Sequence, residues 1–294
     1  MSLVIAQIIN GLQSGSIYAL VALGYSMVYG IILLLNFAHG DIIMVAAYII
    51  FISMMMMGLP LWAAILLCVV LSALVGMLIE RVAYRRLLVR NVPRISLLIT
   101  AIGVSIFLQN LFQLIFGSDA KPMQKFFDLP ALSVFGVSIT STTILNIVTS
   151  VIMMICLQLL VGRTRMGKAM RATSEDAGAA KLMGINTNHI IALTFAIGSA
   201  LAGVGAVLYC NTYQQIKPIM GSMLGLKAFV AAVLGGIGSI PGAMLGGYIL
   251  GAAEGLTTSF ISSNLTDAVV FGILILVLLF KPAGLLGKNV REKV

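Results

Sequence analysis

The chain has 294 residues, of which 60% are hydrophobic and only 9% are charged, and its mean hydropathy is +1.11. A soluble domain carries about 25% charged residues, so this composition excludes soluble globular packing. The net charge of +9 does not indicate a nucleic-acid partner. Fourteen of the eighteen Lys and Arg fall in three clusters, at 81–94, 163–181 and 281–293, and basic clusters in short loops mark the cytoplasmic side of a membrane protein.

Long uncharged runs predict helices of the roughly 20 residues that cross a bilayer. Helices are expected because each segment in lipid must satisfy its own backbone hydrogen bonds. In chain order the expected segments are 12–35, 42–57, 61–79, 94–116, 141–161, 189–210, 222–234, 243–260 and 267–280. The segment 222–234 is short enough to be re-entrant. The prediction is an all-α, polytopic transmembrane bundle of 8–9 membrane segments within one domain, 1–294, with a cytoplasmic C-terminus.

No catalytic or metal-binding pattern is visible. The three cysteines, Cys68, Cys156 and Cys210, stand singly without C-x-x-C spacing. Neither a nucleophile–base arrangement nor a set of metal ligands occurs, so we expect no enzyme activity, no metal and no cofactor.

A polar island at 162–189 interrupts the apolar sequence and carries seven charged residues. Thr173 and Asp176 have the spacing of an N-terminal capping box, and Gly184 suits the position that closes a helix. Between them we expect a helix of about ten residues, roughly 15 Å long. Its small residues, including Ala179 and Ala180, would let another protein approach closely. The alternative is an ordinary solvated loop helix.

The stretch 36–41 places Asn36, His39 and Asp41 in an otherwise apolar region. Polar groups at membrane depth are costly and usually face a cavity or one another. A broken helix that contributes to a translocation pathway is one interpretation. In the other, Gly40 ends one helix and Asp41 caps the next.

The glycines of 235–242 resemble a phosphate loop only superficially, because the Gly-Lys-Ser/Thr ending is missing. The pattern favours a tight turn between closely packed helices. The alternative is a re-entrant corner in which Gly235, Gly236 and Gly238 line a pathway.

Lys227 and Glu254 lie about 10 Å in from the outer ends of their segments, counted at roughly 1.5 Å per residue. Equal depth on neighbouring antiparallel helices predicts a structural ion pair. Alternatively, Lys227 extends to the outer membrane interface.

Four stretches together resemble the permease subunit of bacterial high-affinity branched-chain amino acid ABC importers. They are 36–41 (NFAHGD), 80–85 (ERVAYR), 165–172 (RMGKAMRA) with 182–186 (LMGIN), and 231–243 (AAVLGGIGSIPGA). The resemblance implies a second related permease, two cytoplasmic ATP-binding subunits and an extracytoplasmic protein that delivers Leu, Ile or Val.

The resemblance also implies that 162–189 is the loop that couples the permease to an ATPase. Its candidate residues are Arg171, Glu175, Asp176, Ala179, Ala180 and Gly184. ABC permeases often carry Glu-Ala-Ala-x-x-x-Gly at this point, whereas this chain reads GAAKLMG at 178–184. Glycine therefore replaces the glutamate, and Glu175 lies one turn earlier.

The sequence thus predicts a multi-pass import permease of the bacterial cytoplasmic (inner) membrane, surrounded by lipid. An ABC permease of the same architecture for urea or short amides is the nearest alternative. A secondary transporter driven by an ion gradient is an alternative from another class. It would need paired acids or a proton relay, and only Asp41, Glu254 and Asp267 are offered within the membrane segments.

Overall fold

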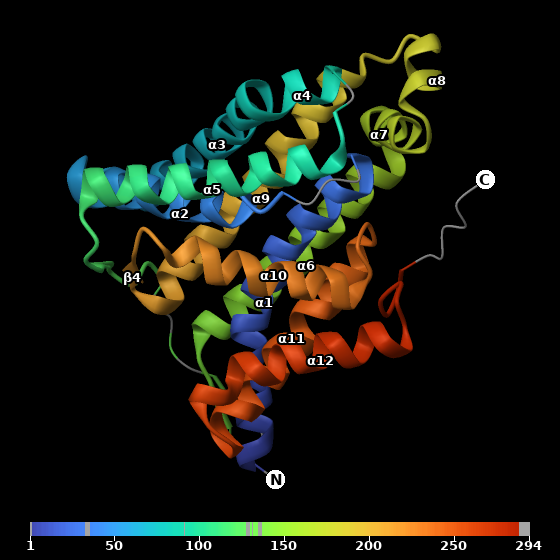
Figure 1. Ribbon diagram of the computed structural model, residues 1–294. Helices are drawn as coiled ribbons and strands as arrows, with labels where there is room; N and C mark the ends of the chain where they lie inside the picture. The colour runs from blue at the N-terminus through green and yellow to red at the C-terminus, as the bar shows by residue number, and fades with distance from the viewer. Residues whose placement is uncertain are drawn as a thin grey trace.

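The computed structural model describes residues 2–32, 36–90, 92–127, 130, 132–134 and 137–287. Most of these residues form helices that lie against one another in a single bundle (Figure 1). The predicted all-α membrane fold is therefore confirmed.

The helices and strands, in chain order, are α1 (Ser2–Ile32), α2 (His39–Phe51), π-helix η1 (Ile52–Met56), α3 (Leu61–Ile79), π-helix η2 (Glu80–Tyr84), α4 (Arg85–Val89), α5 (Arg94–Phe116), β1 (Lys121–Pro122), β2 (Leu132–Val134), β3 (Val137–Ile139), α6 (Ser141–Arg163), α7 (Arg165–Glu175), α8 (Ala177–Leu182), α9 (Thr187–Tyr213), β4 (Gln215–Ile216), α10 (Met220–Gly235), α11 (Ile240–Phe260), 3-10 helix η3 (Ser263–Leu265) and α12 (Thr266–Phe280).

The centre of the bundle includes α1, α2, α9 and α10, and 11 of the 16 residues of α10 are buried. In α1, α2 and α9 between 67% and 78% of the most apolar stretch is buried, whereas in α3, α5, α6 and α12 at most 28% is buried. The outer helices present large apolar side chains on the surface, among them Leu66, Ile99 and Leu279. Such a surface suits contact with lipid.

Glycines allow the first helix to pack closely on the eleventh. A Cβ atom built on Gly11 would overlap the carbonyl oxygen of Gly251, and one built on Gly251 would overlap that of Gly11. Two backbones can approach so closely only where small residues face each other. This glycine contact holds α11 antiparallel to α1, and α10 and α12 in turn pack on α11.

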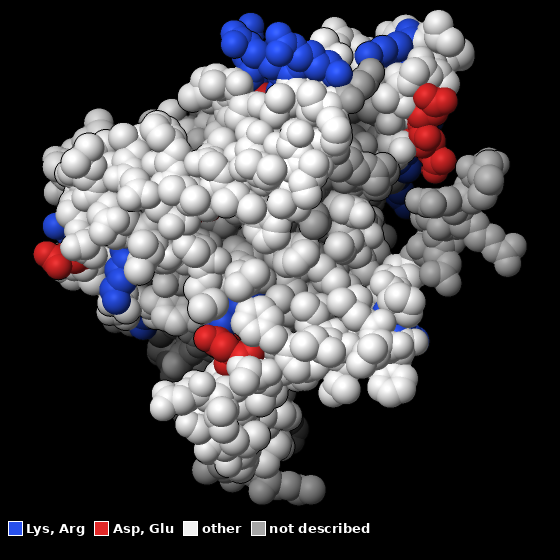
Figure 2. All heavy atoms as spheres, in the orientation of Figure 1, with Lys and Arg blue, Asp and Glu red and all other residues white. Residues whose placement is uncertain are grey.

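The two ends of the bundle carry different elements. At one end β1 pairs antiparallel with β4, which brings the loops after α5 and α9 together. At the other end lie α4, α7 and α8, and Figure 2 shows Lys and Arg side chains gathered where α4 lies. This distribution agrees with a basic cytoplasmic end.

The structure supports fewer crossings than the upper predicted number. Seven helical spans are separately long and apolar enough to cross a membrane, and α10 with α11 forms an eighth if this pair, bent by 120°, counts as one. Nine crossings would require α10 and α11 to count separately, but α10 has only 16 residues. The predicted cytoplasmic C-terminus falls on 288–294, outside the described residues.

Candidate functional site

The first candidate site is a helical hairpin, α7–α8, at the basic end of the bundle (Figure 1). Thr164 is the N-cap of α7, and its Oγ1 accepts a hydrogen bond from the Gly167 backbone N–H at 3.0 Å. Gly167 lies against the last turn of α6, where a Cβ would overlap the carbonyl oxygen of Val161. Arg171 then donates hydrogen bonds to the carbonyls of Val161 and Gly162. These contacts hold α7 firmly to the end of α6.

The helix start within 162–189 differs from the predicted one. Asp176, not Thr173, caps α8: its Oδ1 accepts from the N–H groups of Gly178 at 2.7 Å and Ala179 at 3.0 Å. Thr173 lies inside α7 and donates to the Ala169 carbonyl. The predicted single helix of about ten residues is therefore wrong. Two helices, of 11 and 6 residues, meet at Asp176, because α7 is an amphipathic helix that continues through Thr173 while packing on α6, α9 and α1.

The tip of the hairpin exposes most of the residues predicted for docking. Arg171, Glu175, Asp176, Ala179 and Gly184 are exposed, whereas Ala180 is buried against the bundle. Gly184 closes α8 as predicted, with φ at +82°.

Sequence reasoning did not select Leu182 and Met183, although their side chains are 91% and 82% exposed at the same tip. Large apolar side chains so exposed on a projecting hairpin mark a surface that another protein would cover. The signal was present in the sequence, as two large apolar residues directly before the closing glycine of a polar island.

The second candidate site is the polar stretch before α2. Asn36, His39 and Asp41 are each only 1% exposed. The proposal that Gly40 ends one helix and Asp41 caps the next is wrong, since α2 begins at His39 and both residues lie in its first turn. Asp41 instead accepts a hydrogen bond of 2.9 Å from the Gln109 side chain of α5.

The neighbours of this stretch come from distant parts of the chain. The His39 ring packs edge-on against Tyr25 at a centroid distance of 4.9 Å, and Tyr84 reaches Asn36 from η2. Among the described residues, Asn36 Nδ2, His39 Nε2 and Asp41 Oδ2 have no hydrogen-bond partner. The stretch is thus enclosed inside the subunit in this conformation, and its assignment to a translocation pathway stays a prediction.

The third candidate site, 235–242, forms a tight turn between α10 and α11. Gly236 and Gly238 have φ of +104° and +88°, a region that suits glycine. The Gly238 N–H donates to Ser26 Oγ of α1 at 2.9 Å. On the other side, Leu286 after α12 donates its N–H to the Gly235 carbonyl at 2.9 Å. The turn therefore joins α1 to the segment after α12, and its place in a pathway also stays a prediction.

Lys227 lies next to two carboxylates. Its Nζ is 2.8 Å from Glu254 Oε1, as the predicted ion pair requires, and 2.9 Å from Asp267 Oδ1. The contact with Asp267 was not predicted from sequence. Asp267 occupies the first turn of α12, and only the packing of α10 and α11 on α12 brings it near Lys227.

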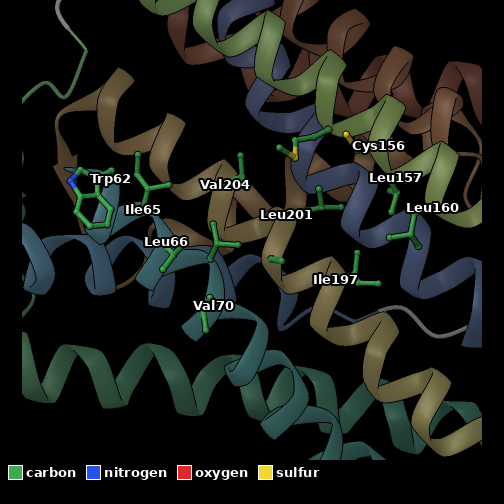
Figure 3. A pocket seen from close by; sticks show the side chains of 13 residues that line it. Trp62, Ile65, Leu66, Val70, Cys156, Leu157, Leu160, Ile197, Leu201 and Val204 are labelled. Atoms are coloured by element: carbon green, nitrogen blue, oxygen red, sulfur yellow. The ribbon is translucent and has the colours of Figure 1, made fainter. Parts of the chain in front are cut away.

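A groove of about 560 Å³ lies on the outer surface between α3, α6 and α9. Figure 3 shows its apolar walls, with Trp62, Leu66 and Val70 from α3, Leu157 and Leu160 from α6, and Leu201 and Val204 from α9. A site for a polar substrate needs a few convergent polar groups, and this wall offers almost none. We therefore assign it no role in binding a polar molecule. No cluster of His, Cys, Asp and Glu suited to a metal occurs among the described residues.

Comparison with known proteins identifies the class to which these features belong. The sequence profile of the family described as "Branched-chain amino acid transport system / permease component" matches residues 7–279. The chain belongs to this permease family. It is accordingly a multi-pass permease of the inner membrane.

Several curated relatives match over nearly their whole length. BraD of Pseudomonas aeruginosa, a high-affinity branched-chain amino acid transport system permease protein, is 49% identical, with 98% of this chain and 97% of the relative covered. LivH of Escherichia coli K12, which bears the same description, is 46% identical with the same coverage. The probable permease LivH of Methanocaldococcus jannaschii is 29% identical over 92% of this chain and 89% of the relative. No solved structure matches the fold.

Proposed function

We propose that this permease imports the branched-chain amino acids Leu, Ile and Val as the membrane-spanning subunit of an ATP-driven ABC importer. The names of relatives that are 46–49% identical over nearly the whole chain support this substrate class. The family membership supports transport without covalent chemistry, so ATP hydrolysis would belong to partner subunits.

The observation that carries the ATP-driven assignment is the exposed tip of the α7–α8 hairpin. Leu182 and Met183 project from the basic end of the bundle, and Asp176 and Gly184 fix the helix on either side of them. A rigid projection with an apolar tip is suited to fill a hollow on a soluble protein. The partners we propose are two cytoplasmic ATP-binding subunits, a second related permease and an extracytoplasmic substrate-binding protein.

The hairpin is also placed to transmit motion into the membrane. Its first helix is joined to α6 by Arg171 and Gly167, and its second leads into α9, where Asn186 caps the first turn by accepting from the His189 N–H at 3.1 Å. Since α9 packs on α1, α2 and α3, displacement of the hairpin would tilt helices at the centre of the bundle. We propose that this tilt changes the permease pair between outward-open and inward-open states.

Co-purification tests the proposal. The variant Leu182→Asp with Met183→Asp should lose an associated ATPase that accompanies the wild type, and cells that carry it should lose leucine uptake. A matched control is Ser118→Asp with Ala120→Asp, which adds the same charge at exposed positions in the loop after α5, away from the hairpin. The control should keep the associated ATPase. If no ATPase accompanies the wild type under gentle conditions, the ATP-driven assignment fails, and a carrier driven by an ion gradient becomes the alternative to pursue.

A further inference from the structure

A second cavity, of about 330 Å³, lies between α1, α9, α10 and α11. It reaches β4, so it is on the side of the bundle opposite the α7–α8 hairpin. Ligand sites in proteins usually measure about 300–1,000 Å³, so this cavity suits one small molecule. Unlike the groove in Figure 3, it has both polar and apolar walls.

The polar wall contains the ion cluster of Lys227. Lys227 and Glu254 line the cavity, and Asp267, which is not among the lining residues, lies 2.9 Å from Lys227 Nζ. Figure 2 shows acidic and basic side chains together on an otherwise uncharged part of the surface, over α10–α12. One ammonium faces two carboxylates, so the cluster carries a net charge of about −1 when all three groups are ionised.

One acceptor in this cluster is not fully satisfied. Glu254 Oε2 is shielded from solvent and accepts no hydrogen bond of ordinary geometry among the described residues, although the Tyr18 hydroxyl interacts with this carboxylate. A buried carboxylate oxygen without a donor is costly, which favours a donor arriving from outside. Lys227 also retains Asp267 at 2.9 Å if Glu254 turns to another cation. The cluster can therefore open its Lys227–Glu254 contact without leaving Lys227 unpaired.

The remaining walls suit an aliphatic side chain beside a charged group. Met220, Met223 and Leu224 of α10 supply apolar surface. Opposite them lie Tyr18, whose ring is 5.9 Å from Lys227 Nζ, and the ring pair Tyr209–Tyr213. Gln215 and the exposed Lys217 also line the cavity. A buried ammonium beside a carboxylate, next to an apolar wall, matches an α-amino acid with an aliphatic side chain.

We propose that this cavity binds the zwitterionic cargo on its way into the membrane. The substrate carboxylate pairs with Lys227, its ammonium pairs with Glu254, and its aliphatic side chain lies against Met223 and Leu224. The proposal rests on the proposed function, because it takes a branched-chain amino acid as the cargo. It gives the Lys227–Glu254 pair a role beyond joining two helices.

Binding to the permease itself tests this site. The full-length protein, purified with the subunits that accompany it but without a soluble binding protein, is placed in lipid nanodiscs. Saturation-transfer NMR then measures L-leucine, with 4-methylpentanoate and 3-methylbutylamine as probes that each lack one charged group. We expect leucine to bind at least tenfold more tightly than either probe. We expect Glu254→Gln and Lys227→Met each to weaken leucine binding at least tenfold.

Loss of leucine binding in the charge variants could also result from misfolding, so a further variant changes the cavity and leaves the ion cluster intact. Met223→Trp narrows the cavity at a side chain that is 48% exposed, and it should also weaken leucine binding. Leu226→Trp is the matched control, since Leu226 is 36% exposed on the same helix but does not line the cavity. Equal leucine binding by wild type and all cavity variants would overturn the site, as would no leucine binding by the wild type.

Leucine uptake by cells that carry the wild-type system shows whether a failure concerns the cavity site or the transport assignment. If cells import leucine through the intact system while the cavity variants bind leucine normally, the cavity is not the site but the transport assignment holds. If the intact system imports no branched-chain amino acid, the transport assignment itself fails.

Discussion

The hydroxyl of Tyr84 donates a hydrogen bond of 2.8 Å to Oδ1 of Asn36, although the two residues are 48 positions apart. Tyr84 lies at the end of η2, directly after α3, and Asn36 lies just before α2. Both side chains are buried, and the Tyr84 ring also packs on Phe195 of α9 at 5.4 Å. A π-helical turn thus positions one side chain that links η2 to the stretch before α2 and to α9 at the basic end of the bundle.

Removing this hydrogen bond should lower stability. Tyr84→Phe leaves Asn36 Oδ1 buried without a donor, which costs about 1–3 kcal/mol. The expected result is a lower midpoint of thermal unfolding for the purified protein in detergent. In the double variant Tyr84→Phe with Asn36→Leu no buried acceptor remains, so part of the loss should be recovered. A double variant that is as unstable as the sum of both single changes would contradict the assignment.

Close packing between α2 and α10 gives a second prediction. A Cβ on Gly40 would overlap the Gly221 carbonyl and lie 2.8 Å from Gly225 Cα. Because backbone atoms cannot move aside as side chains do, Gly40→Ala should destabilise the protein by about 1–3 kcal/mol. Gly103→Ala is the control, since no atom lies within 4 Å of its Cβ and alanine favours helix by about 1 kcal/mol. Thermal unfolding of both variants should therefore shift in opposite directions.

The helix-closing position of the hairpin gives a third prediction. Gly184 has φ at +82°, and a Cβ added there would meet no atom within 4 Å, so Gly184→Ala suffers backbone strain of about 1–2 kcal/mol without a clash. We expect reduced ATPase co-purification and an unchanged unfolding midpoint, because α8 is a local element at the periphery. Asparagine tolerates this conformation better, so Gly184→Asn should retain more ATPase.

The matched control for that experiment is Gly162→Ala. Gly162 is helical and also has no atom within 4 Å of its Cβ, so alanine there should leave ATPase association intact. If Gly184→Ala and Gly162→Ala behave alike, the conformation of the hairpin tip does not govern docking.

The membrane helices could be predicted from sequence because their signals are local. The expected segments 61–79 and 94–116 match α3 and α5 at both ends. Their starts were predictable because Pro60 and Pro93 directly precede the first helical residue of each helix. Uncharged length and proline position suffice for such assignments. The bent pair α10–α11 was harder, because hydropathy does not reveal whether two short helices cross separately.

The contacts of the candidate sites could not be predicted in the same way. The capping-box spacing at Thr173 and Asp176 was visible, but Asp176 became the cap because burial of Met170 and Thr173 extends α7 to Glu175. Asp41 accepts from Gln109, which is 68 residues away, so no local pattern contains that contact. Asp267 reaches Lys227 for the same reason, through tertiary packing alone.

Exchanging the charges of Lys227 and Glu254 tests whether this pair only joins two helices or also binds the substrate. Asp267→Asn is included, because a glutamate at 227 would otherwise face Asp267, whose carboxylate is 2.9 Å from the present lysine. In this background Lys227→Glu alone places two carboxylates together and should lower the unfolding midpoint. Adding Glu254→Lys restores opposite charges, so the midpoint should return close to that of Asp267→Asn alone.

Leucine binding should not recover with stability in the reversed pair. The substrate ammonium would then pair at 227 and its carboxylate at 254, which turns the aliphatic side chain away from Met223 and Leu224. We expect leucine affinity to stay at least tenfold below that of Asp267→Asn. Full recovery of both stability and leucine binding would mean that the pair only joins α10 to α11, and the zwitterion site would have to be abandoned.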